Sequence, residues 1–187
     1  MASRQLTKYG TGDFWFDRAF FVDCGLTYNG APADTFAGLG HLEGKTVNIL
    51  VDGAVHPQRV VTGGQVTLDV EGSVVHIGLP ITADLETLPL AMGIDNAFGQ
   101  GRFKNINKVY LRVYRSSGIF VGPTADELVE AKQRTTEDYG TPPALKSEEI
   151  EVVTRNAWDD SGQIFVRQSD PLPLTIVSMT MEVAIGG

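Results

Sequence analysis

Apolar and polar residues alternate with a period of two in several short segments of the chain, a pattern that predicts β-strands. In segment 65–70, Val66, Leu68 and Val70 face one side and polar residues face the other. Further strands are predicted at 14–22, 46–51, 54–62, 73–79, 108–114, 119–122, 149–154, 163–168 and 174–185. Strands this short and this regularly spaced are typical of a small all-β barrel or sandwich.

Glycine separates many of these predicted strands. The chain has 21 glycines among 187 residues, above the usual share of roughly 7%. Turns are expected at Asp52-Gly53, Gly63-Gly64, Glu71-Gly72 and Ser116–Gly118, and a turn-rich connection at Cys24–Gly30.

Proline gives a more local signal in segment 54–62. Pro57 lacks the amide hydrogen that a central strand needs, so this segment is expected to be an edge strand or to contain a bulge.

Residues 124–134 are the only helix-like segment. Thr124 and Glu127 make a capping-box pattern. The segment is short and its apolar residues Leu128 and Val129 are adjacent, so a stable helix is not favoured.

We therefore expect an all-β fold made of two small β-barrel or sandwich modules, with long Gly/Pro-rich loops and little helix. Residues 1–13 are expected to form a flexible lead-in. The first module is predicted over 14–90 and the second over 91–187, with a long loop at 122–148.

Composition narrows the classes of function. Hydrophobic residues make up 42% of the chain and charged residues 20%, which excludes a disordered tail. No apolar stretch approaches the roughly 18 residues of a membrane-spanning helix. The first residues lack the apolar segment of a signal peptide. The single cysteine excludes an internal disulfide framework and fits a reducing compartment.

The net charge is −8, from 15 Lys and Arg against 23 Asp and Glu. A surface that binds nucleic acid without sequence preference usually has the opposite sign. The one local excess of positive charge contains Arg102, Lys104, Lys108, Arg112 and Arg115. This cluster is interpreted as a solvated or salt-bridged strand face, with a nucleic-acid face as the less favoured alternative.

Metal and nucleophile chemistry have weak support. His41, His56 and His76 are the only histidines, 15 and 20 residues apart, without any metal-ligand spacing. His56 and His76 could meet across neighbouring strands, but hydrogen-bonded sheet histidines are the simpler expectation. Cys24 has neither a histidine nor a helix start beside it in sequence, so we expect a buried, inert thiol.

Carboxylate pairs occur at Glu137-Asp138, Glu148-Glu149 and Asp159-Asp160. Adjacent strand residues point to opposite faces, so such pairs cannot face each other across a cleft as glycosidase carboxylates do. They are interpreted as solvated loop residues.

The segment Gly38–Gly44 resembles a phosphate-binding loop, but it lacks the following helix and the Lys-Ser/Thr of a P-loop. We interpret it as a turn before the strand at 46. The sequence thus predicts no catalytic, cofactor-binding or metal residue, no cofactor and no enzymatic activity. Many strands, exposed aromatic residues and long loops are typical of a subunit completed by its neighbours.

Several segments, in one order, resemble the C-terminal part of the tail tubular protein B family, the nozzle proteins of short-tailed bacteriophages and prophages. The segments are FFVDCGLTYNG (20–30), LGHLEGKTV (39–47), DGAVHP (52–57), VHIGLP (75–80), LETLP (85–89), INKV (106–109) and VRQSDPLPL (166–174). Residues 39–90 are similar to a small β module labelled by its likeness to the first catalytic cysteine half-domain of ubiquitin-activating enzymes. That label implies no ubiquitin chemistry, and Cys24 lies outside the module.

The resemblance covers roughly 14–185, whereas nozzle proteins are several times longer and carry a β-propeller-like region before this part. It implies a non-catalytic virion subunit, made in the bacterial cytoplasm and placed in the phage tail. Nozzle proteins form six-fold rings around the DNA exit channel, so the implied partners are copies of the chain in a hexamer, adaptor proteins and fibres. DNA would pass nearby without tight binding, and no membrane anchor is implied.

An alternative is a host-surface or carbohydrate-binding module of a tail. Exposed aromatic rings stack on sugars, and Trp15, Tyr110 and Trp158 are the candidates. Core packing or a subunit contact would explain the same residues. An enzyme such as a cell-wall hydrolase has the least support.

Overall fold

The computed structural model describes residues 20–91, 93–94, 97–98, 101–132, 137 and 141–186. The strands are β1 (Val22–Ala37), β2 (Thr46–Val51), β3 (Ala54–Val60), β4 (Gln65–Pro80), β5 (Ala83–Glu86), β6 (Gly93–Ile94), β7 (Ala97–Phe98), β8 (Lys104–Val113), β9 (Phe120–Gly122), β10 (Val129–Glu130), β11 (Glu149–Val153), β12 (Phe165–Gln168) and β13 (Ile176–Ile185). All the pairings between these strands are antiparallel, and the helical element among the described residues is the short 3-10 helix Gly40–Leu42. The predicted all-β fold with little helix is confirmed.

The first sheet has the strand order β1-β4-β2-β3 and encloses the first core. Its core side chains alternate along the strands, as Val47, Ile49 and Val51 do in β2 and Val75 and Ile77 do in β4. β1 pairs with both ends of β4 through three register shifts, and this bend lets one strand curl around the core. Among the described strands β1 and β3 are the two edges, so this sheet is open rather than a closed barrel.

The remaining large sheets, β10-β9-β12-β5 and β11-β8-β13, pack face to face as a sandwich. One apolar cluster joins them, with Val109 and Leu111 from β8 facing Val121 from β9 and Val166 from β12. The buried face of β8 is the one predicted from the sequence, because Val109, Leu111 and Val113 are all buried.

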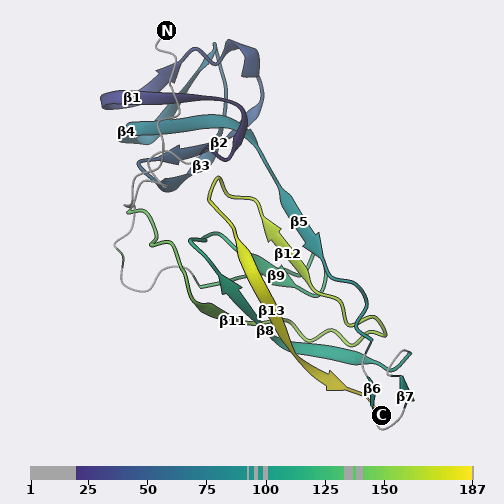
Figure 1. Cartoon of the computed structure of the whole chain (residues 1–187). Coiled ribbons are helices and arrows are strands. Elements are labelled where there is room, and N and C mark those ends of the chain that lie inside the picture. The colour runs from purple at the N-terminus through teal and green to yellow at the C-terminus, as the bar shows by residue number, and fades with distance from the viewer. Residues whose placement is uncertain are drawn as a thin grey trace.

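Figure 1 shows the first sheet and the sandwich one above the other, with the chain passing between them from β4 into β5. β5 pairs with β12 of the sandwich, although residues 83–86 fall within the module expected at 14–90. The chain therefore changes sheets between Pro80 and Ala83. The expected lead-in at 1–13 and most of the expected strand at 14–22 lie outside the described residues.

Several turn predictions are confirmed. The turn between β2 and β3 contains Asp52 and Gly53, with φ of 48° and 88°. Gly63 and Gly64 adopt φ of 63° and 71° between β3 and β4. Pro57 lies in an edge strand, beside a register shift between Val47 and Ile49 of the partner strand, as expected for a proline inside a sheet.

Other predictions are wrong, because long bulged strands replace the expected turns. Cys24–Gly30 lies within β1, and Glu71-Gly72 lies within the 16-residue strand β4. Gly72 accommodates a close approach instead of a turn, because a Cβ there would overlap Val51 and lie 2.7 Å from Val75. The helix-like segment beginning at Thr124 forms a turn and then β10 in its described part.

The alternation predicted for the last strand is interrupted near its start. A register shift lies between Ile176 and Ser178, so Ile176 packs against the sandwich core while Val177 is 61% exposed. Beyond the shift, Met179, Met181 and Val183 pack on the core side, as the predicted alternation places them together. The bulge therefore moves one apolar residue to the surface.

Candidate functional site

The three histidines lie in separate environments. His41 Nε2 is 2.8 Å from the carbonyl oxygen of Cys24, and His76 Nδ1 is 2.7 Å from Thr27 Oγ1. His56 is buried in a network of its own on β3 and β4. No group of three or more potential metal ligands occurs in the described part of the chain.

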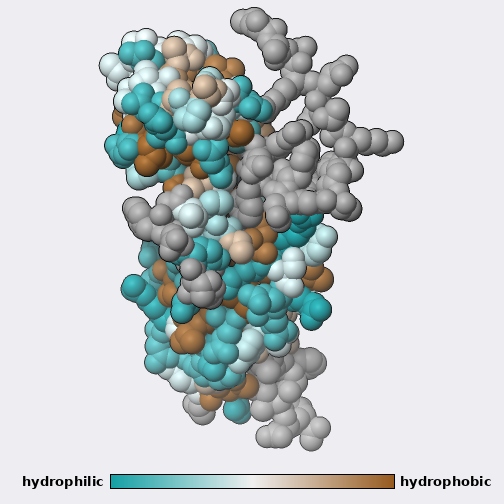
Figure 2. Space-filling model, turned by 90° about the vertical axis from the view of Figure 1, so that its left-hand side faces the viewer, coloured by the Kyte–Doolittle hydropathy of each residue, from teal (hydrophilic) through white to brown (hydrophobic). Residues whose placement is uncertain are grey.

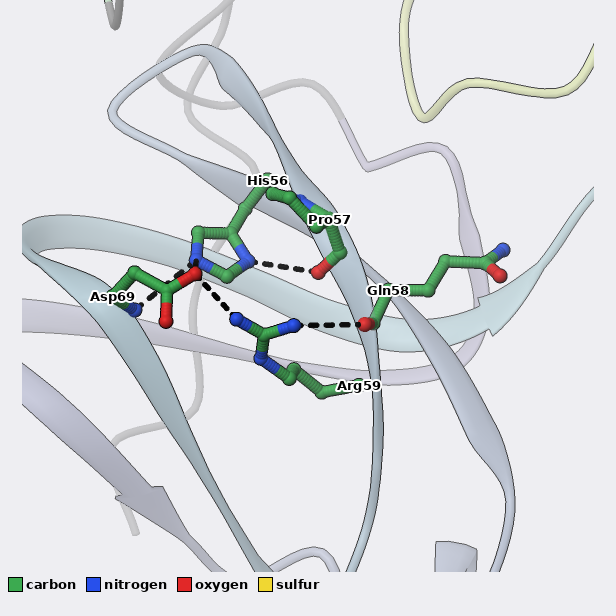
Figure 3. A network of polar contacts seen from close by, with 5 residues as sticks. All are labelled: His56, Pro57, Gln58, Arg59 and Asp69. Carbon is green, nitrogen blue, oxygen red and sulfur yellow. Dashed lines mark hydrogen bonds and ion pairs between the residues drawn. The ribbon is translucent and has the colours of Figure 1, made fainter.

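The environment of His56 fixes its tautomer (Figure 3). The amide of Asp69 donates to His56 Nε2 at 3.2 Å, so this nitrogen is an acceptor and the proton lies on Nδ1. Nδ1 then donates to the carbonyl of Pro57 at 2.8 Å. The Asp69 carboxylate pairs with Arg59, which also donates to the carbonyl of Gln58 at 3.4 Å. The His56 imidazole therefore links the bulge of β3 to β4 through hydrogen bonds.

Cys24 is exposed, so the expectation of a buried thiol is wrong. Its backbone adopts φ of 49° inside a bulged part of β1, which turns the residue out of the regular pleat. The amide of Cys24 is bonded to Asp23 Oδ1 at 2.8 Å. The sequence did not reveal that His41 lies beside Cys24, and the histidine ring contacts the carbonyl of Cys24.

The carboxylate pairs have separate partners rather than a common cleft. Glu148 pairs with Lys146 at 3.3 Å, while Glu149 belongs to β11 and lies opposite Arg112. Asp159 Oδ1 accepts hydrogen bonds from Ser161 Oγ and the Gly162 amide.

The third pair is described only in part. Glu137 Oε1 accepts a hydrogen bond from the amide of Ala144 at 3.3 Å, and Asp138 lies outside the described residues. The expectation of solvated loop residues therefore does not fit Glu149, which is a strand residue, or Asp159, which holds a turn.

The glycine-rich segment 38–44 turns into β2, as predicted, through the 3-10 helix Gly40–Leu42. Its Glu43 carboxylate accepts the amides of Gly63 at 2.9 Å and Gly64 at 2.7 Å. Two successive amides with positive φ form the kind of concave donor pair that binds anions. This donor pair is occupied by the chain's own Glu43, and it links two turns of the first sheet.

The residues of the basic cluster do not form one positively charged surface, because Lys104 is buried and Lys108 and Arg112 lie beside carboxylates. Lys104 is 1% exposed, and its Nζ donates to the carbonyls of Arg102 at 3.1 Å and Asp160 at 2.7 Å. Lys108 pairs with Glu151 at 2.8 Å, and the Glu151 carboxylate raises the pKa of Lys108. Arg112 lies opposite Glu149 in the neighbouring strand. The outer face of β8 is therefore a charge-balanced sheet face, in line with the favoured interpretation.

A second ion pair stabilises the edge of the other sheet of the sandwich. Arg167 in β12 donates to both carboxylate oxygens of Asp84 in β5, at 2.7 and 2.9 Å. The guanidinium lowers the pKa of Asp84, mainly through these hydrogen bonds. This pair fastens β5, the strand through which the chain enters the sandwich, to its neighbour.

Apolar side chains are exposed at the end of the sandwich that lies far from the first sheet. Phe103 is 60% and Trp158 50% exposed, and a Cβ at Gly186 would lie 3.4 Å from Phe103 and 3.5 Å from Trp158. We call Phe103, Trp158 and Gly186 the end patch. Of the predicted sugar-stacking residues, Trp158 belongs to this patch, Tyr110 is partly buried on β8, and Trp15 lies outside the described residues.

A groove of about 530 Å³ opens beside the bend of β1. Leu26, Tyr28, Phe36 and Ile77 supply much of its apolar lining, and no charged side chain belongs to the described lining. Such a groove favours apolar contacts over the recognition of a charged ligand.

The first sheet and the sandwich meet through a small buried joint. Leu50 and Leu172 are 1% and 2% exposed and pack together with Leu145. Asn48 Nδ2 donates to the carbonyl of Ser169 at 3.0 Å, and Gln58 Nε2 donates to Asn48 Oδ1 at 2.7 Å. β2 is therefore buried on both of its faces, which explains why the sequence TVNILV alternates only in part.

No protein-family model matches this sequence, and no curated protein matches it either. Among the described residues there is no helix with the length and apolar character that crossing a bilayer requires. The features available for a functional assignment are therefore the motifs of the sequence, the balanced charge on β8, and the apolar residues left at the surface.

Proposed function

We propose that this chain is a structural, non-catalytic component of a bacteriophage or prophage tail, either a nozzle or tail-tube subunit or its C-terminal domain. In this role it forms part of a ring around the DNA exit channel of the virion. Its partners are copies of itself, six in the ring by family resemblance, together with adaptor and fibre proteins. The ordered set of family-like segments between Phe20 and Leu174 is the starting point of this proposal.

The observation that carries the proposal is the amount of apolar side chain left at the surface. Figure 2 shows hydrophobic residues among hydrophilic ones along both parts of the displayed face. Among the described residues, the most exposed large hydrophobic side chains are those of Val60, Val70, Leu88, Phe103, Tyr114, Val153, Trp158 and Val177. Where such side chains lie together, as Phe103 and Trp158 do in the end patch, they favour contact with another subunit, which would remove them from water.

Charge supports the same proposal. A channel wall that carries many free cations would hold DNA through its phosphates, because each neutralised phosphate adds binding free energy. The chain has a net charge of −8, and Lys108 on the outer face of β8 is paired with Glu151. A wall of this composition allows DNA to slide past.

The test is to locate the protein on phage particles. Antibodies against the purified chain, bound to gold, are applied to virions that carry it and viewed by electron microscopy. We expect label at the distal end of the tail, and ring-shaped particles in samples of the assembled protein. Virions that carry no label on the tail would overturn the proposal.

The exposure of Trp158 favours one second candidate, a carbohydrate-binding module of the tail. A half-exposed indole beside Phe103 offers a flat surface on which a sugar ring can stack. A glycan array separates the two candidates. Specific binding that is lost in Trp158→Ala supports the second one, and binding that is absent or unchanged removes it.

A further inference from the structure

The last strand of the sandwich has an open edge. β13 runs for ten residues from Ile176 to Ile185 and pairs with β8 on one side. No described strand pairs with its other side. Figure 1 shows β13 in yellow, running the length of the sandwich. A strand edge of this length carries a row of backbone donors and acceptors that another strand can use.

The other described edges carry features that hinder strand addition. Pro57 interrupts β3, Asp84 and Glu86 are exposed on the four-residue strand β5, and Glu149 and Glu151 are exposed on β11. β6, β7 and β10 have two residues each, and β1 is broken by three register shifts. β13 has one charged residue, Glu182, and no proline. Among the described edges it is therefore the one best suited to accept a strand.

The hydrogen bonds at the end of β13 show which residues face this open edge. Gly186 N donates to Phe103 O at 2.8 Å, so Gly186 directs its backbone groups toward β8. Residues of an antiparallel strand alternate in this direction, so Ile185 and Val183 direct theirs away from β8. The register shift after Glu182 skips Asn107 of β8 and leaves the alternation of β13 intact. Met181 and Met179 therefore also face the open edge.

We propose that β13 pairs with β13 of a second copy of this chain, antiparallel and with Thr180 opposite Thr180. The pairing joins two three-stranded sheets into one sheet of six strands. Two copies of one strand pair symmetrically only in the antiparallel sense, and each copy then fills the open edge of the other. The strand that occupies the open edge is thus β13 of a second copy. The pairing uses the open edge of β13 in both copies, so it forms a closed dimer.

In this register, the side chains of β13 in one copy are complementary to those of β13 in the other copy. Glu182 lies opposite Ser178, a neutral hydroxyl, whereas a register centred on Glu182 would set two carboxylates against each other. Thr180 faces its own copy, and threonine pairs are favourable across strands. Charge and hydrogen bonding therefore select the same alignment.

This pairing goes beyond the proposed tail function and does not rest on it. It uses the β13 edge of both copies and leaves the end patch and the first sheet for other contacts. Failure to label virions would leave the pairing untouched, and failure of the pairing would leave the tail proposal standing.

The first experiment measures the mass of the full chain by sedimentation equilibrium across a range of concentrations. We expect the wild type to reach twice the chain mass of 20.2 kDa. Thr180→Lys sets two cations opposite each other and should weaken the dimer by at least about tenfold. Val153→Lys on β11, the other edge of the same sheet, is the matched control and should dimerise as the wild type does.

The second experiment tests the register by crosslinking. Thr180 directs its backbone toward β8, so the new Thr180 pair is of the non-hydrogen-bonded type, in which side chains approach most closely. In a Cys24→Ser background, Thr180→Cys should therefore form a disulfide-linked dimer under mild oxidation. Ser178→Cys, which would face Glu182, and Val153→Cys should crosslink far more slowly.

A wild type that stays monomeric at high concentration would overturn the pairing. A dimer that is unchanged by Thr180→Lys, or open-ended aggregates in place of a closed dimer, would do so as well. Crosslinking of Thr180→Cys no faster than of Val153→Cys would exclude this register.

Discussion

The side-chain amide of Asn48 donates a hydrogen bond of 3.0 Å to the carbonyl oxygen of Ser169, which lies 121 positions later in the chain. Asn48 is 5% exposed and belongs to β2 of the first sheet, while Ser169 directly follows β12 of the sandwich. Leu50 and Leu172 pack together at the same joint. The two cores are thus connected by a buried polar contact beside an apolar one, as well as by the covalent chain.

We expect Leu172→Ala to uncouple the two cores. Removing a buried leucine side chain should lower the free energy of unfolding by about 2–5 kcal/mol. The loss falls at the joint, so unfolding of the first sheet and of the sandwich should separate into two steps. Denaturant titrations followed by hydrogen exchange measure both effects. Leu88→Ala, at a position that is 85% exposed, is the control and should change stability by less than about 0.5 kcal/mol.

The joint also shows what a local pattern can and cannot predict. The sequence predicts β2 and its turn well, because a hairpin at Asp52-Gly53 depends on neighbouring residues. It does not predict that Leu50 and Asn48 face a second buried surface, because their partners Leu172 and Ser169 are brought there by tertiary packing. Burial on both faces removes the alternation by which an amphipathic strand is recognised.

Gly72 shows a different kind of error, in which the sequence predicts a turn where the structure has a continuous strand. Glu71-Gly72 has the composition of a turn, yet β4 continues through it. The glycine is required because β2 and β4 come close there, where a Cβ would overlap Val51. Local composition cannot separate a glycine needed for a turn from one needed for a close approach.

We therefore expect Gly72→Ala to destabilise the first sheet through overpacking, by about 1–3 kcal/mol. Adding Val51→Ala to it should restore part of the loss, because it removes the methyl groups that the new Cβ meets. Gly40→Ala is the matched control, since a Cβ there meets nothing within 4 Å. Thermal unfolding of the four proteins measures these differences. A Gly72→Ala protein as stable as Gly40→Ala would contradict the steric explanation.

The contacts of the charged side chains are less predictable from the sequence than the strands are. The sequence shows five cations close together, but not that Lys104 would be buried among carbonyl groups. Its burial depends on Asp160, which is distant in sequence and has no recognisable spacing to it. The pairing of Lys108 with Glu151 likewise depends on the register between β8 and β11. Strand alternation predicts which residues share a face, but not which residues of another strand they meet.

We expect the purified protein to leave duplex DNA unretarded in a gel at about 100 mM salt, because its negative charge opposes contact with phosphates. The combined variant Glu149→Lys and Glu151→Lys should bind DNA measurably, because it releases Lys108 and Arg112 from their acidic neighbours. Tight, salt-sensitive binding by the wild type would contradict both this prediction and the charge argument for the tail channel.

Asp170 has a titration that affects stability. It lies just beyond β12, partly buried, and burial raises the pKa of its carboxyl, with a smaller contribution from the negative charge of Glu130. A raised pKa means that the folded protein holds the proton more tightly than the unfolded chain does. Asp170 therefore stabilises the fold at pH values below the ordinary aspartate pKa, and this contribution is lost as the pH rises through the raised pKa.

We expect Asp170→Asn to raise the melting temperature at pH 7 by about 2 °C, because it removes a carboxylate that burial and Glu130 disfavour. At pH 3.5 the wild-type carboxyl is already largely protonated, so the variant should have little advantage there. Asp160→Asn makes the same chemical change at an exposed position and is the matched control. Melting curves of the three proteins at both pH values measure the effect. An advantage for Asp170→Asn that is as large at pH 3.5 as at pH 7 would show that packing, rather than ionisation, is its cause.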